Sequence, residues 1–292
     1  MNDAVRTEIN DEARWNLLQK KTQEIRVVQA FELFRKNGIE PILIKGYAAA
    51  RNYPESETRL SIDIDFAVAA ADFDRAREIK APEGIGIDVH RELRHLDTLP
   101  WEDLFGNSQM IEVDSCRARV LRDEDHLRVL CVHWLTDGGS DKSRLWDIYY
   151  AVANRPPDFD WGRFLDVVTP RRRRWLVATV GLARRYLGLD VSGTPIDAEA
   201  RHLPKWLEKT VEREWAAETK TRPMEAVVLE PAMFVKQFVK RLRPNAIRAT
   251  VEAEGDFEAR TRVHYQIRNF VSRIKPTVRR IVETVRGLSR ER

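Results

Sequence analysis

Two aspartates on one face of a short strand are the residues in this sequence best suited to chemistry. The run from Leu60 to Val68 alternates apolar and polar residues, and Asp63 and Asp65 fall on its polar side. Two carboxylates held side by side repel each other, and one tends to keep its proton unless a cation neutralises the pair. Oxygen-rich sites suit Mg²⁺, which keeps several waters and shares itself with substrate phosphates. This strand therefore predicts a magnesium site.

A third carboxylate belongs to another predicted strand. The run from Gly86 to His90 also alternates, and Asp88 and His90 share its polar face. Three carboxylates on neighbouring strands can hold two metal ions about 3.5–4 Å apart, an arrangement that suits in-line displacement at phosphorus. One ion would lower the pKa of an attacking hydroxyl, and the other would stabilise the leaving pyrophosphate. We therefore expect Asp63, Asp65 and Asp88 to bind Mg²⁺. His90 would orient Asp88 or the substrate.

A basic turn before these strands predicts a phosphate site. The apolar run Pro41–Ile44 reads as a buried strand, Lys45 and Gly46 follow it, and residues 47–53 then read as a short helix. A strand end that leads into a helix start presents backbone N–H groups and the positive end of the helix dipole. A glycine there lets a phosphate approach the backbone. Arg59, on the loop before the first acidic strand, would hold a β- or γ-phosphate.

The predicted elements change character along the chain. Before residue 122 we expect helices at 12–36, 47–53 and 71–79, strands at 41–44, 60–68 and 86–90, and a hairpin at 109–113 and 117–121. Beyond it we expect helices at 123–135, 145–153, 161–168, 171–187, 204–218 and 233–242. The fold class is therefore α+β: a small mixed β-sheet domain over residues 1–122, followed by an all-helical domain over residues 123–292.

Composition sets the broad class. The 292 residues are 43% hydrophobic, which is enough for a sizeable core and argues against global disorder. Two cysteines, Cys116 and Cys131, exclude a disulfide framework. The polar N-terminus does not resemble a signal peptide, and no apolar run is long enough to span a membrane. A cytoplasmic protein is expected. The net charge of +4 divides into −3 over residues 1–100 (15 basic, 18 acidic) and +7 over the rest (35 basic, 28 acidic).

The run I-L-I-K-G-Y-A-A-A-R-N-Y-P-E-S-E-T-R-L-S-I-D-I-D-F-A-V, followed by I-D-V-H-R-E-L, resembles a bacterial family of nucleotidyltransferases. Those proteins are similar in layout to DNA polymerase beta-like nucleotidyltransferases. The resemblance covers roughly residues 40–92 and, more loosely, residues 123–152. It implies metal-dependent transfer of a nucleoside monophosphate from an NTP, such as ATP, with release of pyrophosphate. Asp63, Asp65 and Asp88 would be the metal ligands, and Asp88 the possible base. The wider superfamily has Gly-Ser where this chain has Lys45 and Gly46.

Several other residues have two interpretations each. His126 and His133 are two helical turns apart, so they line the cleft, bind metal, or pack between helices. Asp147 either faces the cleft or pairs with Arg144 three residues earlier. The aromatic residues Trp146, Tyr149 and Tyr150 either stack on a base or pack between helices. The basic run of residues 171–174 at a predicted helix start either binds a phosphate-bearing acceptor or forms a solvated face.

The C-terminal segment from Ile267 to Arg292 has eight basic and two acidic residues. Within it an apolar stripe is formed by Val278, Ile281, Val282, Val285 and Leu288. Such a helix packs on the helical domain, or contacts a membrane surface, RNA or a partner. The sequence does not select the acceptor, which is a small molecule, a peptide or an RNA end. The alternative to an enzyme is a non-catalytic nucleotide-binding, RNA-binding or partner-binding protein on the same fold.

Overall fold

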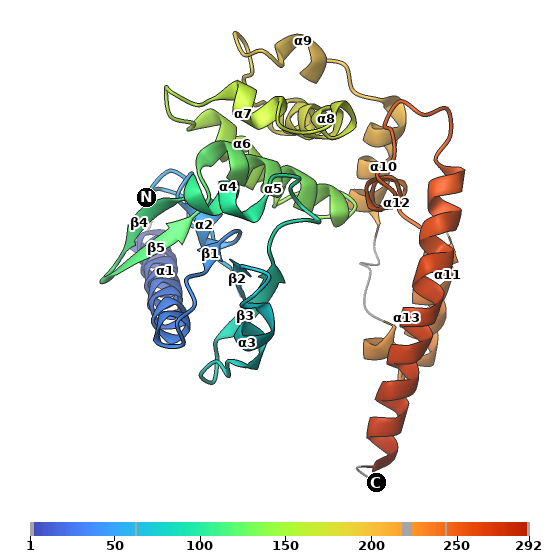
Figure 1. The fold of residues 1–292 in the computed structure, drawn as a ribbon, viewed down its shortest axis with the longest axis horizontal. Coiled ribbons are helices and arrows are strands. Elements are labelled where there is room, and N and C mark those ends of the chain that lie inside the picture. Colours follow the sequence, from blue (N-terminus) through green and yellow to red (C-terminus); the bar gives the residue numbers. More distant parts are fainter. Residues whose placement is uncertain (1–2, 62, 218–223, 243, 291–292) are drawn as a thin grey trace.

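The computed structural model describes residues 3–61, 63–217, 224–242 and 244–290. A five-stranded sheet occupies the N-terminal part, and helices form the remainder (Figure 1). The strands are β1 (Ile42–Leu43), β2 (Asp63–Val68), β3 (Gly86–Arg91), β4 (Gln109–Val113) and β5 (Cys116–Val120). The prediction of an α+β fold with a small sheet is confirmed.

The sheet is mixed, with the strand order β3-β2-β1-β5-β4. β1 pairs antiparallel with β2 and parallel with β5, and β4 and β5 form the expected hairpin. β2 and β3 are parallel, and their register places Asp63 opposite Gly86 and Asp65 opposite Asp88. The two acidic strands are therefore direct neighbours at one side of the sheet. Ile62, expected at the start of the first acidic strand, lies outside the described residues.

One face of the sheet is covered by the N-terminal helix α1 (Asp3–Lys36). The helix ends where Asn37 and Gly38 were expected to end it, with Gly38 at φ 70°. Phe31 and Phe34 of α1 meet Phe66 of β2 edge-on, at centroid distances of 4.9 and 5.0 Å. Because side chains alternate along a strand, burying Phe66 against α1 turns the two aspartates of β2 to the opposite face.

The remaining helices follow the expected order, with three additions. They are α2 (Tyr47–Ala50), α3 (Phe73–Glu78), α4 (Trp101–Gly106), α5 (Asp123–Thr136), α6 (Leu145–Ala153), α7 (Trp161–Leu165), α8 (Pro170–Leu187), α9 (Asp197–Ala200), α10 (Lys205–Ala216), the 3₁₀ turn η1 (Glu225–Val227), α11 (Pro231–Leu242), α12 (Ala246–Glu252) and α13 (Val263–Arg290). The sequence pattern did not predict α4, α9 or α12. They have six, four and seven residues, too few for a helical period to stand out.

The helical part and the free face of the sheet share one apolar core. Ile44 and Ala67 of the sheet region belong to the same buried cluster as Leu127 and Leu130 of α5. α5 is buried on nearly every side, so its charged residues need partners. Arg128 supplies one such set, because it donates to Asp97 at 2.8 Å and to Asp125 at 2.6 Å in the protein interior.

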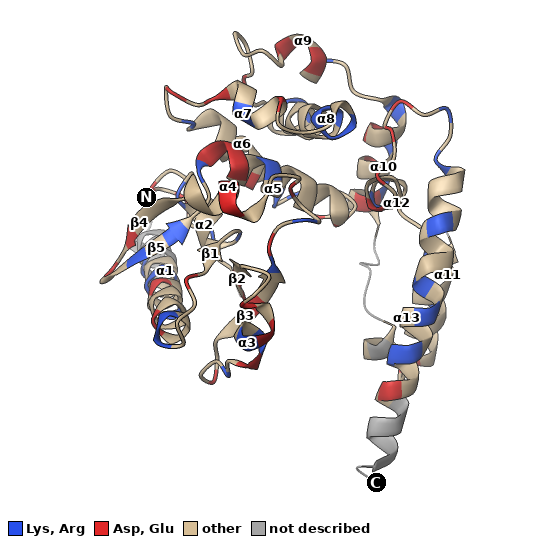
Figure 2. Cartoon of the chain, in the orientation of Figure 1, with Lys and Arg blue, Asp and Glu red and all other residues tan. Residues whose placement is uncertain are grey.

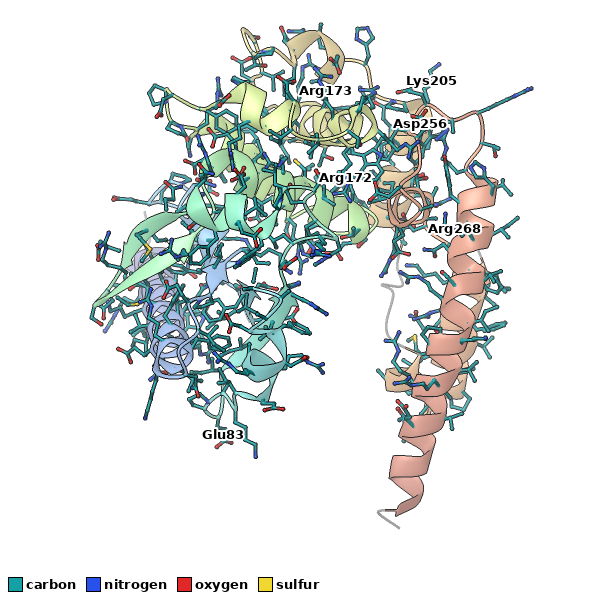
Figure 3. All side chains as sticks on the ribbon, viewed as in Figure 1. Glu83, Arg172, Arg173, Lys205, Asp256 and Arg268 are labelled. Carbon is teal, nitrogen blue, oxygen red and sulfur yellow. The ribbon has the colours of Figure 1, made fainter. Side chains whose placement is uncertain are left out.

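The basic run at the start of α8 holds the helical part together. Arg172 pairs with Glu254, Arg173 with Glu199, and Arg174 with Glu258. The Arg172 side chain is buried, so the expectation of a solvated face is wrong for this residue. Figure 3 shows Arg172 and Arg173 on α8, with Asp256 close by at the turn before α13. These ion pairs account for cations at a helix start without a phosphate ligand.

The C-terminal helix α13 leaves the body of the protein as an extended arm (Figure 1). Its first turns pack on α12, and both α11 and α13 contact η1. The expectation that its apolar stripe packs on the helical domain is wrong for Val278 and Val282, whose side chains are 54% and 40% exposed. The side chains of Val285 and Leu288, two further members of that stripe, lie outside the described part of the chain. Among the described residues no helix combines the length and apolarity needed to cross a bilayer.

Candidate functional site

Side chains from β2 and β3 converge on the face of the sheet turned away from α1. Asp65, Asp88 and His90 each place one ligand atom within 4.8 Å of the others. His90 Nε2 lies 3.4 Å from Asp65 Oδ1 and 3.3 Å from Asp88 Oδ2. Because the strands are parallel and in register, alternation brings these three side chains to one face. Two carboxylates and an imidazole at this spacing form a donor set that suits a divalent cation.

Asp63 is the first residue of β2, two residues before Asp65, and is not a member of this group. It shares the face of Asp65, and its exposed side chain extends over the opposing Gly86. A Cβ at Gly86 would stand 2.5 Å from Asp63 Oδ1, so a glycine is required there for Asp63 to keep this position. The structure thus brings two of the three expected carboxylates together with His90, and Asp63 lies beside them.

Lys45 reaches the acidic group from the turn after β1. Its Nζ lies 2.7 Å from Asp65 Oδ1, and both side chains are largely buried. Gly46 has φ 56°, and a Cβ there would stand 2.5 Å from Ser61 Oγ. This glycine therefore lets the turn carry the lysine inward against the loop before β2.

The expected backbone phosphate cradle at this turn is smaller than the sequence predicted. α2 spans four residues, and the amides of Ala48, Ala49 and Ala50 donate to the carbonyls of Lys45 and Gly46 within the turn. Three of the N–H groups assigned to phosphate are therefore used locally. The positive charge that faces the acidic strands comes from the Lys45 side chain.

The surroundings of Asp65 favour its ionised form. Burial raises its pKa, but the ring of His90 and the ammonium of Lys45 outweigh that effect, so the pKa lies below 3.8. The Asp88 side chain is 64% exposed, against 15% for Asp65. The site thus combines an enclosed carboxylate held between two nitrogen donors and a second carboxylate open to solvent.

Two further histidines lie around this group. His95 stacks on His90, with centroids 5.4 Å apart, and burial together with the charge of His90 lowers its pKa. Burial, Lys45 and Arg144 lower the pKa of His133 on α5 to about 3. Of these two histidines, only His133 is a candidate that the sequence pattern indicated. His95 lies on an irregular turn after β3, and no sequence period singled it out.

Arg144 also lies close to His133. Its Nη1 is 3.1 Å from His133 Nε2 and donates to Asp137 Oδ2 at 2.8 Å. The expected i−3 pair between Arg144 and Asp147 is therefore wrong. His133 presents a neutral ring between this ion pair and the Lys45–Asp65 pair.

Asp147 is instead the partner of Arg59. Arg59 Nε donates to Asp147 Oδ1 at 2.7 Å, and Nη2 donates to Oδ2 at 3.1 Å. Tyr53 also donates to Asp147, at 2.7 Å. The arginine assigned to a phosphate is thus held in a bidentate ion pair that joins the loop before β2 to α6. Arg59 lies on the loop before β2, as the sequence predicted, but Asp147 already neutralises its charge.

The aromatic residues of α6 pack mainly on one another. Trp146 stacks on Tyr150 at 5.5 Å, and Tyr150 contacts Tyr53 at 4.5 Å. Trp146 is 36% exposed, while Tyr150 is buried. The packing interpretation therefore holds for Tyr150, and Trp146 forms the accessible edge of the cluster.

His126 of α5 is fully buried beside the turn after β1. Its ring nitrogens meet no partner at good hydrogen-bond geometry among the described residues, and the backbone of Ile44 is the polar group that approaches the ring. Burial, then the charge of Arg51, hold its pKa well below 6.5. It does not belong to the group around Asp65, so the interpretation as a packed histidine fits the geometry better.

The sheet and the acidic group agree with the comparison to protein families. The model of the family described as an uncharacterised nucleotidyltransferase matches residues 1–79 and 79–188. Because the match covers more than half of the 292 residues, the chain belongs to this nucleotidyltransferase family. No curated protein and no solved structure matches the chain.

Proposed function

We propose that this protein transfers a nucleoside monophosphate from an NTP, with ATP as one candidate, to a hydroxyl group of an acceptor. The acceptor is a small molecule, a peptide or an RNA end. The observation that carries the proposal is the convergence of Asp65, Asp88 and His90 on one face of the sheet, in a chain of the nucleotidyltransferase family. That convergence joins two neighbouring strands and leaves one carboxylate accessible to a substrate.

The donor set fits a Mg²⁺ site. Asp65 and Asp88 would hold the ion, with Asp63 beside them and His90 orienting both carboxylates. A bound divalent cation would polarise the phosphoryl oxygens and offset their charge. A second ion would use Asp63, whose carboxylate extends over Gly86. Lys45 neutralises Asp65 in the absence of substrate, and its ammonium is close enough to the group to meet an entering phosphate.

The acceptor hydroxyl attacks the α-phosphorus of the NTP in this proposal. A bond forms between the acceptor oxygen and phosphorus, the bond to the oxygen that bridges the α- and β-phosphates breaks, and pyrophosphate leaves with that electron pair. The acceptor proton passes to a carboxylate. Asp88 suits this role better than Asp65, because its side chain is 64% exposed while Asp65 is engaged by Lys45.

The test uses NTPs labelled at the α-phosphorus, with Mg²⁺ and separate pools of small hydroxylated metabolites, peptides and RNA. We expect label on one acceptor pool and an equal amount of pyrophosphate. Asp65→Asn and Asp88→Asn should each lower the rate at least about a hundredfold, because charge stabilisation by a bound metal supplies several kcal/mol. Asp74→Asn is the matched control, since Asp74 is an exposed carboxylate on α3.

Two outcomes would contradict the proposal. Transfer that persists in both Asp65→Asn and Asp88→Asn would show that the reaction uses another site. NTP binding without transfer to any pool would favour the alternative of a non-catalytic nucleotide-binding protein. The Lys45–Asp65 pair would then serve as a permanent neutralising contact.

A further inference from the structure

The arm formed by α13 carries an apolar stripe that faces solvent. Its members recur every three or four residues, so they lie on one side of the helix. They are Val263 (57% exposed), Ile267 (59%), Val271 (59%), Ile274 (45%), Val278 (54%) and Val282 (40%). Apolar side chains scattered singly over a surface need no explanation, but a continuous stripe over five turns of helix does.

α11 has the same character. Val235, Phe238, Val239 and Leu242 follow the helical spacing i, i+3, i+4 and i+7, and each is at least 51% exposed. The opposite side of α11 is turned inward, since Gln237 is fully buried. Both helices contact η1, so the two apolar faces belong to one part of the molecule.

Basic residues border both faces. On α13, three basic residues each directly follow a member of the stripe, and all three are exposed: Arg268, Lys275 and Arg279. On α11, Lys236 and Lys240 directly follow Val235 and Val239. Figure 2 shows bands of Lys and Arg along α13 and one acidic band. Glu283 is the one acidic residue in the described part of this helix. The arm therefore combines exposed apolar side chains with an excess of positive charge.

The exposed apolar stripe and its basic border together favour one class of binding partner over the others. A second copy of α13 would bring Arg268 and Lys275 beside equally basic residues, and like charges across such a seam are unfavourable. RNA would bind the cations but would leave the apolar stripe in water. A membrane surface with anionic headgroups matches both features, because the stripe enters the acyl boundary and the flanking cations meet the headgroups.

We propose that the arm formed by α13, together with the exposed face of α11, docks this protein on an anionic membrane surface. The apolar faces enter the interface while Arg268, Lys275 and Arg279 stay at headgroup level. This proposal does not depend on the transfer reaction. It adds a location at which the reaction would take place.

The test is co-sedimentation of the full chain with vesicles of phosphatidylcholine alone or mixed with phosphatidylserine. We expect binding to the mixed vesicles and little binding to the neutral ones. Arg268→Gln, Lys275→Gln and Arg279→Gln combined should weaken binding by about fivefold per charge removed. The charge-matched control combines Lys36→Gln, Arg75→Gln and Lys80→Gln, three exposed residues of the α/β part.

A second variant tests the stripe. Ile267→Gln, Val271→Gln and Ile274→Gln combined should abolish vesicle binding and leave thermal unfolding nearly unchanged, because these side chains are exposed in the folded protein. Its control replaces Trp15, Leu17 and Leu18 of α1 by Gln, since these are also exposed apolar residues. Loss of binding in the α1 control alone would overturn the assignment to the arm.

Other occupants give different results. If the wild type sediments as a dimer and the stripe variant as a monomer, a second copy covers the arm and the proposal fails. If a short single-stranded RNA binds, and the charge variant but not the stripe variant loses it, the arm is an RNA surface. Equal binding to neutral and anionic vesicles would remove the role of the basic border.

Discussion

Asp65 is the most constrained residue of the candidate site. Lys45 and His90 both approach its Oδ1 atom, so its charge is compensated before any ligand enters. Asp88 shares His90 with it but stays open to solvent. The two carboxylates that we propose as metal ligands therefore differ in exposure, and this difference is why the proposal assigns the acceptor proton to Asp88.

His126 gives a prediction at the same scale. Its ring stays neutral in the folded protein because its pKa lies well below 6.5, whereas the unfolded chain binds a proton below that pH. The free energy of unfolding is therefore unaffected by His126 above pH 6.5. It decreases as the pH falls from 6.5 toward the pKa that His126 has in the folded protein. His126→Phe removes this loss, so between pH 7.5 and pH 5 the variant should lose about 2 kcal/mol less stability than the wild type.

Urea unfolding at several pH values measures this difference. His202→Gln is the control, because it removes an exposed histidine and leaves His126 in place. If the curves of His126→Phe and of the wild type run parallel between pH 7.5 and 5, His126 is not the buried neutral group described here.

At the scale of elements, the pairing of β2 with β3 creates the site, and α6 steadies the loop that leads into it. Alternation along each strand predicted which residues share a face. The expectation that the two acidic strands are neighbours is confirmed, but local patterns did not predict that they run parallel, because strand direction depends on contacts remote in sequence. The same limit explains Asp147, whose partner Arg59 is 88 residues away, whereas local spacing pointed to Arg144.

The Arg59–Asp147 pair provides a prediction for this scale. Its side chains are 21% and 7% exposed, and the contact is bidentate. A double-mutant cycle with Arg59→Gln and Asp147→Asn should give a coupling energy of about 1–3 kcal/mol in unfolding, as expected for enclosed, hydrogen-bonded partners.

The exposed i,i+4 pair of Arg279 with Glu283 serves as the control cycle and should give about 0.3–0.5 kcal/mol. A coupling energy for Arg59 and Asp147 as small as that would mean that α6 does not hold the loop. Arg59 would then be free to bind phosphate, as the sequence suggested.

At the scale of the whole molecule, the sheet and the helices are joined by a common core. The boundary at residue 122 coincides with the change from strands to helices, but buried residues on both sides of it form one cluster. The division into two domains stays a prediction. Composition and periodicity were sufficient for the fold class and for most long helices, since those depend on local patterns.

The arm shows where local patterns are not enough. The sequence predicted an apolar stripe on the C-terminal helix, and two of its members, Val278 and Val282, belong to the exposed stripe of α13. Whether such a stripe packs inward depends on the position of the helix relative to the body. Similarly, the family match supports nucleotidyl transfer in general, while the grouping of Asp65, Asp88 and His90 depends on which side chains the sheet brings together.

Binding of Mn²⁺, a paramagnetic substitute for Mg²⁺, tests the central claim most directly. Titration followed by electron paramagnetic resonance, with and without an NTP, measures the affinity of the wild type, of Asp65→Asn, of Asp88→Asn and of the control Asp74→Asn. We predict that the wild type and the control bind Mn²⁺ alike and that each of the other two variants binds at least about tenfold more weakly. Equal affinity in all four proteins, or no binding by the wild type even with an NTP, would contradict the account.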